Sequence, residues 1–212
     1  MDRKHIKYSF AFTGANALVA ETITVAEVFA EMGDWKRTYA EVQKKNLLHK
    51  IKAETVVREF REIKKRISTL TSDQLKLMIE GGRNQSKAMI LLGIVQTYDF
   101  IRDFIIEVVR NKYLIHDRVL FDSDYQKFLD SKSVIDVSID NLSEQSKQKI
   151  KTVVFRILEQ VGLLDDPQQK RIMFPMLDAK CLRVITNDNP NLLKCFLYSD
   201  QEIRTLSQQI RA

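Results

Sequence analysis

The sequence predicts a mainly α-helical protein, and two observations favour this fold class. The chain of 212 residues contains only three prolines and six glycines, whereas an all-β fold needs many turns. Apolar residues recur at intervals of three and four along much of the chain, which is the spacing of one face of a helix. The hydrophobic content of 44% is ordinary for a globular protein, and the length allows one or two domains.

The N-terminal segment is predicted to hold an aromatic arm followed by two helices. Aromatic and small residues alternate over residues 8–12, "YSFAF", which indicates a short strand or an extended arm packed on the core. A helical period begins near Ala17, and Gly33 is predicted to end that helix. Asp34 can cap the next helix, which is expected to end near Asn46.

A third helix is predicted over Thr55–Leu70, which reads "TVVREFREIKKRISTL". On a helical wheel, other apolar residues of this stretch lie within about 40° of Val56; they are Phe60, Ile63, Ile67 and Leu70. Arg58, Arg61 and Lys65 lie about 140° to 200° away from Val56. These three cations are therefore expected to face solvent.

Two helices followed by a third with a basic outer face is the order of a helix-turn-helix module. A helix-turn-helix-like N-terminal domain is therefore predicted over residues 1–82. The alternative interpretation is a solvated helix face that carries excess positive charge. Glu59 and Glu62, the acidic residues of the stretch, are expected to share the basic surface.

A long central helix is predicted at the start of a second region, residues 83–140. Thr71 and Gln74 first form the pattern of a capping box for a short fourth helix. The central helix is then expected to cover Ser86–Ile115, with a bend near Gly93. Its uncharged apolar run of eleven residues is too short for a membrane span, which needs about 18 to 20, so no membrane association is predicted.

The boundary before the last region is expected in a polar segment. Asp122 or Ser123 can cap a short helix that precedes it. The segment "SKSVIDVSIDN" that follows is polar and irregular, and allows a short strand. We therefore place the predicted domain boundary there.

The C-terminal domain, residues 141–212, is predicted to be winged-helix-like. Ser143 can cap a long helix that Gly162 ends. The stretch "LLDDPQQKRIMF" then indicates a short β-hairpin, and a helix followed by a hairpin is the order of a winged helix. A terminal helix is expected over Pro175–Ile185, and the polar tail after Tyr198 is expected to be loosely held.

The positive charge is concentrated in one part of the chain. The net charge is +6, and the window from Lys44 to Arg66 alone holds nine Lys or Arg and three Glu. A localised basic patch is typical of a partner that is a polyanion, with nucleic acid first. The predicted DNA contacts, made mainly to phosphates, are Lys44, Lys45, Lys50, Lys52, Arg58, Arg61 and Lys65, with a weaker second set of Lys147, Lys149, Lys151, Arg156, Lys170 and Arg171.

No motif with catalytic or metal-binding spacing is present in the sequence. The histidines His5, His49 and His116 have no ligand-forming residue at the spacing that a metal site requires. The sequence contains no GxxxxGK[ST], GxGxxG or GxSxG pattern. We predict a protein that is not an enzyme and holds no cofactor or metal. The charged N-terminus is not followed by an apolar signal segment, and Cys181 and Cys195 lack redox spacing, so a cytoplasmic protein with reduced thiols is expected.

Several stretches together resemble the BrxA family of bacteriophage exclusion (BREX) phage-defence systems. The resemblance runs in order from about Tyr8 to Leu177 and is carried by "FTGANALVAET", "GDW", "REFREIKKRISTLTSDQL", "FIRDFIIEVVRNKYL" and "KTVVFRILEQVGLL". It implies a cytosolic, non-enzymatic protein that binds double-stranded DNA through helix-turn-helix or winged-helix modules. Two other functions stay open: a scaffold that docks other BREX subunits, and a helical adaptor that binds RNA.

Overall fold

The computed structural model describes residues 7–166 and 168–211, and within them it is mainly helical, as predicted. These residues contain eleven α-helices, several short 3-10 turns and one π-helical segment. The α-helices are α1 (Val19–Met32), α2 (Trp35–Lys44), α3 (Ala53–Ile67), α4 (Ser72–Glu80), α5 (Arg83–Thr97), α6 (Asp99–Phe104), α7 (Asn111–Leu114), α8 (Asp122–Ser133), α9 (Glu144–Val161), α10 (Ala179–Asp188) and α11 (Asp200–Arg211).

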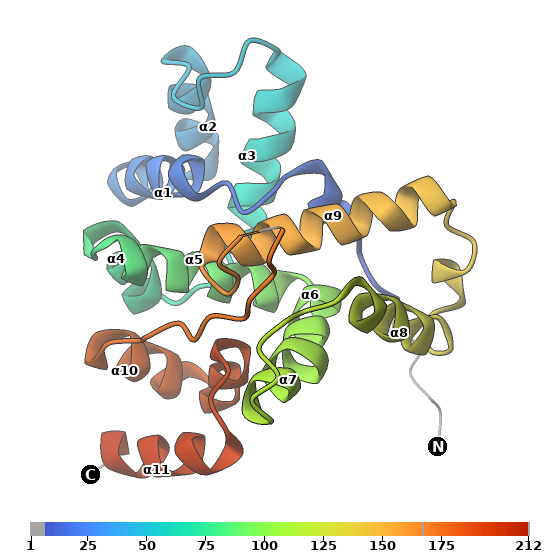
Figure 1. Cartoon of the computed structure of the whole chain (residues 1–212). Helices are drawn as coiled ribbons and strands as arrows, with labels where there is room; N and C mark the ends of the chain where they lie inside the picture. Colours follow the sequence, from blue (N-terminus) through green and yellow to red (C-terminus); the bar gives the residue numbers. More distant parts are fainter. Residues whose placement is uncertain (1–6, 167, 212) are drawn as a thin grey trace, which may run out of the picture.

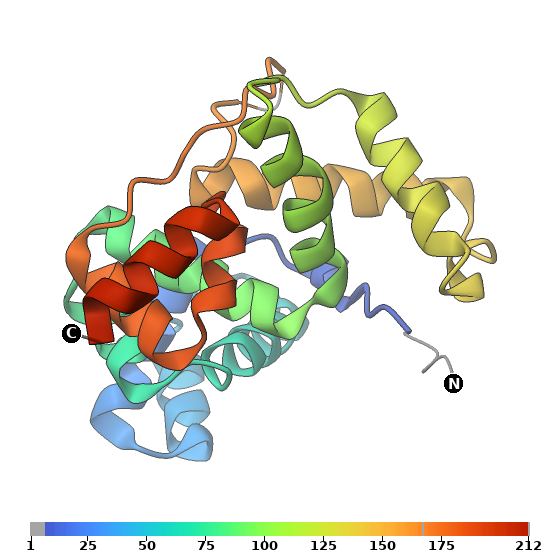
Figure 2. The same ribbon diagram turned by 90° about the horizontal axis from the view of Figure 1, so that it is seen from below.

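The helices α1, α2 and α3 project from one end of the molecule (Figure 1). Helices α4 and α5 lie below them, α9 runs across the middle, and α10 and α11 form the opposite end (Figures 1 and 2). Buried apolar side chains from the whole length of the chain form one contiguous core, including Phe12, Leu92, Phe104, Val154 and Leu193. The projecting end is therefore anchored to the rest of the protein through that core.

Local signals set the N-terminal helix boundaries where the sequence places them. Gly33 ends α1 in the left-handed conformation, with φ of 65°, which glycine adopts without steric cost. The Asp34 carboxylate accepts a hydrogen bond of 2.9 Å from the Arg37 backbone N–H and so caps α2. Thr71 and Gln74 form the predicted capping box at α4. These capping residues thus fix the end of α1 and the starts of α2 and α4.

The aromatic arm packs on the core, as one of the two expectations had it, but it is not extended throughout, because its last residues lie in a 3-10 turn over Ala11–Gly14. The Tyr8 ring lies edge-on to Phe100 at 5.4 Å, and Phe12 lies edge-on to Tyr98 at 5.3 Å. The backbone N–H of Tyr8 donates a 2.7 Å hydrogen bond to the Asp136 carboxylate. Asp136 belongs to the segment predicted as a boundary, where a 3-10 turn over Val137–Ile139 replaces the short strand.

The prediction of one long central helix is wrong. Helix α5 ends at Thr97, and Tyr98 is extended, with φ of −127° and ψ of 97°. Helix α6, a π-helical segment over Ile105–Arg110 and α7 follow in its place. Because the backbone at Tyr98 is not helical, the Tyr98 hydroxyl can donate a hydrogen bond to the Glu62 carboxylate on α3. The break therefore lies at a residue with a long-range partner and not at Gly93.

The β-hairpin expected in the C-terminal region does not form as a regular ladder. Residues 163–173 pair only through isolated antiparallel bridges, Leu164 with Ile172 and Val119 with Arg171, and no strand forms within the described part of the chain. The Asp165 carboxylate accepts hydrogen bonds from the Asp166 and Arg171 backbone N–H groups. These bonds tighten the turn in place of a regular ladder. The predicted turn residue Pro167 lies outside the described residues.

The start of α8 and the tail after Tyr198 also differ from what was expected. Helix α8 is capped through Asp124, whose carboxylate accepts from the Phe121 backbone N–H at 2.8 Å, so Asp122 and Ser123 lie inside the helix. The tail after Tyr198 is not loose but forms α11, because Arg110 donates to the Tyr198 carbonyl at 2.8 Å and pairs with Asp200 at 3.2 Å. Helix α9 is bounded by Ser143 and Gly162 as predicted.

No helix in the described ranges combines the length and the apolar character that crossing a membrane requires.

Candidate nucleic-acid interface

Helix α3 places its two faces as the helical wheel predicts. Val56, Phe60, Ile63 and Ile67 are buried in the core. The opposite face carries Arg58, Arg61 and Lys65, which are exposed. Their charged groups form no ion pair with any residue in 7–166 or 168–211. These three residues, which we call the α3 row, therefore present cations directly to solvent.

Glu59 and Glu62 do not share this surface, which corrects the prediction for them, whereas Glu54 in the first turn of α3 is exposed. Glu59 and Glu62 are each only 7% exposed. Glu59 pairs with Lys50 at 3.2 Å, and Glu62 accepts the hydrogen bond from the Tyr98 hydroxyl. Burial, followed by the bond to Glu62, raises the pKa of Tyr98 well above its ordinary value. The outer face of α3 is consequently more uniformly positive than the sequence suggests.

Arg66 also points inward, although it belongs to the same basic stretch. Its side chain is 2% exposed, and its two terminal nitrogens donate to the backbone carbonyls of Ala15, Asn16 and Ala17 at 3.2, 2.7 and 3.3 Å. These bonds offset part of the cost of burying the guanidinium, whose Nε has no partner within the described residues. Arg66 therefore fastens the start of α1 to α3 and is not part of the basic surface.

The lysines beside the α3 row differ in their surroundings. Lys44 and Lys52 are exposed at the α2–α3 connection and make no ion pair within the described residues. Lys45 is also exposed but bonds to Glu41 at 2.5 Å. Lys50 lies deeper, between Glu21 at 2.9 Å and Glu59 at 3.2 Å. Three of the four lysines thus lie on the surface next to the row, and Lys50 serves an internal ion pair.

Half of the second predicted set of cations is neutralised by neighbouring carboxylates. Lys147 pairs with Glu144 at 2.9 Å, and Asp122 bridges Lys170 at 2.5 Å and Lys151 at 3.1 Å. The bond from Lys170, followed by that from Lys151, lowers the pKa of Asp122. The exposed members that form no ion pair with described residues are Lys149, Arg156 and Arg171.

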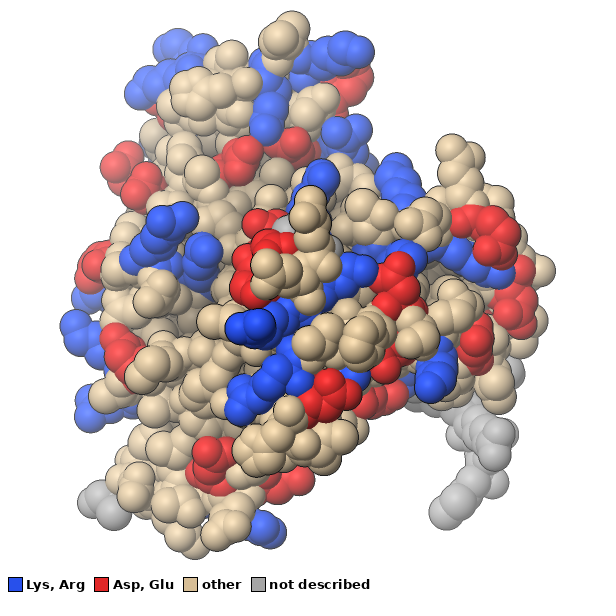
Figure 3. Space-filling view, in the orientation of Figure 1, with Lys and Arg blue, Asp and Glu red and all other residues tan. Residues whose placement is uncertain are grey.

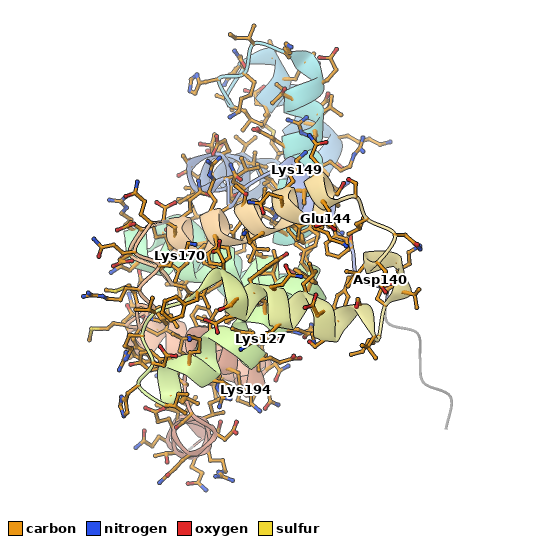
Figure 4. The ribbon with its side chains drawn as sticks, turned by 45° about the vertical axis from the view of Figure 1, so that its right-hand side comes forward. Lys127, Asp140, Glu144, Lys149, Lys170 and Lys194 are labelled. Carbon is orange, nitrogen blue, oxygen red and sulfur yellow. The ribbon has the colours of Figure 1, made fainter. Side chains whose placement is uncertain are left out.

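The charge distribution follows these contacts. In the space-filling view, Lys and Arg gather at the α2–α3 end, whereas across the middle of the molecule they alternate with Asp and Glu (Figure 3). Figure 4 shows Lys149 and Glu144 on the same helix, α9, and Lys170 near the other end of that helix. The sequence did not reveal the role of Asp122, because its lysine partners lie 29 and 48 positions away.

The described residues give no indication of a metal or redox centre. They contain no cluster of three or more His, Cys, Asp or Glu side chains that could hold a metal ion. His49 and His116 are exposed, and His5 lies outside the described residues. Cys181 and Cys195 are buried free thiols, and burial raises the pKa of both to about 12, so both are neutral at physiological pH.

These features define a class of predominantly helical proteins with a basic projecting end. The family model described as BrxA matches residues 6–189, and the chain belongs to the BrxA family.

Named relatives agree with this assignment. The chain is 27% identical over 124 residues to "BREX protein BrxA" of Bacillus cereus (strain H3081.97), a match that covers 54% of this chain and 62% of that relative. It is 20% identical over 159 residues to "BREX protein BrxA" of Escherichia coli O9:H4 (strain HS), covering 75% of each chain.

A solved structure shares the fold. The crystal structure of an uncharacterized protein from Magnetospirillum magneticum superposes with a TM-score of 0.78 and 16% sequence identity, covering 90% of this chain and 98% of that one. At this identity the similarity defines the architecture alone.

Proposed function

We propose that this protein binds double-stranded DNA through its phosphates, with the α3 row as the main contact, as a non-enzymatic cytoplasmic component of a BREX phage-defence system. The names of the relatives supply the BREX context, and other BREX proteins are the expected protein partners. The observation that carries the DNA proposal is the α3 row itself: three exposed cations on one helix face, none held by a carboxylate of the described chain.

Free cations matter because phosphate binding gains free energy from the release of condensed counterions. A lysine already paired with a carboxylate must lose that partner before it can neutralise a phosphate. The α3 row, with Lys44 and Lys52 beside it, has no such cost within the described residues. In the second set, Lys147, Lys151 and Lys170 have to break the Asp122 and Glu144 contacts, and we therefore expect it to be the weaker contact.

The geometry favours contacts to the backbone over base reading. Helices α1, α2 and α3 have the order of a helix-turn-helix module, but residues 45–52 separate α2 from α3, and a regular module has a turn of about three or four residues. Phosphate contacts position a protein on the duplex without reading its sequence. We therefore expect binding with little sequence preference.

The test is a titration against duplex DNA, duplex RNA and single strands at matched salt. We expect duplex DNA to bind best, with log K falling against log salt at a slope of about −4 to −7, since each neutralised phosphate contributes about 0.9. A slope near zero would exclude phosphate contact, preference for RNA would favour the adaptor function, and no binding at low micromolar protein would favour the scaffold.

Matched variants locate the contact. Changing Arg58, Arg61 and Lys65 together to Gln is expected to weaken binding and to flatten the slope by about 3, one for each lost contact. The control changes Lys147, Lys149 and Lys151 to Gln and is expected to have the smaller effect. Loss of binding in the control alone would move the DNA site to α9.

A further inference from the structure

The connection between α8 and α9 exposes apolar side chains in an acidic surrounding. Val134 is 81% exposed, Val137 64% and Ile135 43%. The segment 130–145, which we call the corner, has four acidic residues and one lysine, and that lysine, Lys132, is buried and bonded to Glu107 at 2.6 Å. Three exposed aliphatic residues within four positions exceed the scattered apolar residues normal for a surface, and such a cluster indicates an interaction site.

The connection between α2 and α3 has the opposite charge and its own exposed apolar side chain. Residues 44–52, which we call the tip, contain four lysines and no acidic residue. Ile51 at its centre is fully exposed. A fully exposed isoleucine in a lysine-rich turn gains nothing for folding, because it is buried against no part of the described chain.

The tip and the corner cannot meet within one molecule. The tip lies at the free end of the α2–α3 projection, whereas the corner lies at the far side of the molecule, where α8 and α9 join (Figures 1 and 2). Asp140, labelled at the corner, faces away from the body of the protein (Figure 4). Any pairing of the two surfaces therefore joins two molecules.

We propose that the tip of one copy docks onto the corner of a second copy. One chain carries both halves of a complementary pair: Lys44 and Lys52 around an exposed isoleucine at the tip, and Asp130 and Asp140 around exposed aliphatic residues at the corner. Opposite charges on matching apolar patches favour this pairing and disfavour tip against tip or corner against corner.

The symmetry of the contact follows from its two different surfaces. A contact between unlike patches is heterologous, and each added copy leaves one tip and one corner open. The product is an open chain of molecules and not a closed dimer. Both patches are small compared with a stable interface of about 1,600 Å², so association is weak and reversible, with a Kd on the order of 100 µM.

Sedimentation equilibrium of the full chain, without nucleic acid, tests this proposal. The monomer mass is 24.7 kDa. Between about 10 and 500 µM protein we expect the weight-average mass to rise and to pass the dimer value without a plateau. Raising the salt should reduce association, because exposed charge pairs are screened.

Two variants separate the surfaces. The tip variant carries Ile51→Ser with Lys52→Gln, and the corner variant carries Val134→Ser, Val137→Ser and Asp140→Asn. Each alone is expected to remain monomeric. An equimolar mixture restores one intact tip and one intact corner between the two proteins, so it should form a dimer and nothing larger.

The control is a variant outside both surfaces, and three results would contradict the proposal. Met176→Ser removes an apolar side chain that is 86% exposed but lies on neither surface, and it should associate like the wild type. A wild-type protein that stays monomeric at 500 µM overturns the proposal and leaves the two surfaces to a different protein. A mixture of variants that stays monomeric overturns the head-to-tail geometry, as does association in either variant alone.

Discussion

Gly93 lies where α5 crosses α3. Replacing it by alanine should change the stability of the protein in opposite directions through helix propensity, which favours alanine, and through packing against α3, which favours glycine. A Cβ at position 93 would lie 2.8 Å from the Arg66 carbonyl oxygen and 3.3 Å from its carbonyl carbon, whereas ordinary contacts are 3.4 to 4 Å. The oxygen is part of a helix backbone, so it cannot rotate away. Relief requires α3 and α5 to separate, although both are buried at this point.

The magnitude follows from two opposing effects. In a helix interior, alanine is more favourable than glycine by about 1 kcal/mol. Forcing an extra carbon into a packed site costs about 1 to 3 kcal/mol, and occasionally more, and contact with rigid backbone places Gly93→Ala at the upper end. We expect a net loss of about 2 kcal/mol, or a fall in Tm of about 4 to 8 °C for a chain of this size.

Chemical and thermal unfolding measure this difference directly. The control is Asn84→Ala, an exposed position in the first turn of the same helix, where the propensity gain of about 0.5 kcal/mol is not opposed by a clash. The control should be as stable as the wild type or slightly more so. If Gly93→Ala matches or exceeds the wild type, then α3 does not pack against α5 as closely as the structure shows.

Three further predictions rest on single contacts. Tyr98→Phe should lower the free energy of unfolding by about 1 to 3 kcal/mol, because it leaves the buried Glu62 carboxylate without its donor. Tyr125→Phe should be neutral or stabilising by up to about 1 kcal/mol, because the buried Tyr125 hydroxyl has no partner within the described residues. Denaturant unfolding of both variants measures the difference. Asp122→Asn should release its two lysines, raise duplex affinity and steepen the salt slope by about one contact. The pKa of Asp122 is lowered in the folded state, so its ion pairs are present at neutral pH and are lost as the pH falls through that lowered pKa. The gain in affinity should therefore be absent at acid pH, and a gain that persists there would contradict this assignment. Lys50→Gln should lower stability by about 1 to 3 kcal/mol, because it removes the cation between two carboxylates, and it should leave the salt slope of DNA binding unchanged; a flatter slope would restore Lys50 as a phosphate contact.

Helix boundaries could be predicted where the signal is local. Gly33, Asp34 and the capping box at Thr71 act within one helical turn, so a short stretch of sequence contains the whole cause. The break at Tyr98 could not be predicted in this way, because its partners are Glu62, 36 positions earlier, and Phe12 on the arm. The periodicity of the apolar residues continues across the break and hides it.

The candidate site shows the same division between local and distant causes. The helical wheel places Arg58, Arg61 and Lys65 outward, because the period of α3 is a local property. It cannot show which lysines are already paired: Lys50 meets Glu21 from another helix, and Asp122 meets lysines from α9 and from the turn beyond it. A count of basic residues therefore overestimates the charge available to a polyanion.

Helix α3 shows how a binding surface and a structural core can share one short sequence. Its inner face includes charged residues, Glu59, Glu62 and Arg66, but each contacts a specific donor or acceptor from another part of the chain. Because these contacts take up Glu59 and Glu62, the outer face keeps its three cations with only the exposed Glu54 of its own helix beside them. Changes on the outer face should consequently alter DNA affinity and leave unfolding unaffected, since exposed substitutions shift stability by no more than about 0.5 kcal/mol each. Changes on the inner face, or at Gly93 beneath it, should lower stability first and affect binding only through the position of the helix. A variant of the α3 row that unfolds the protein would show that the two faces are not independent.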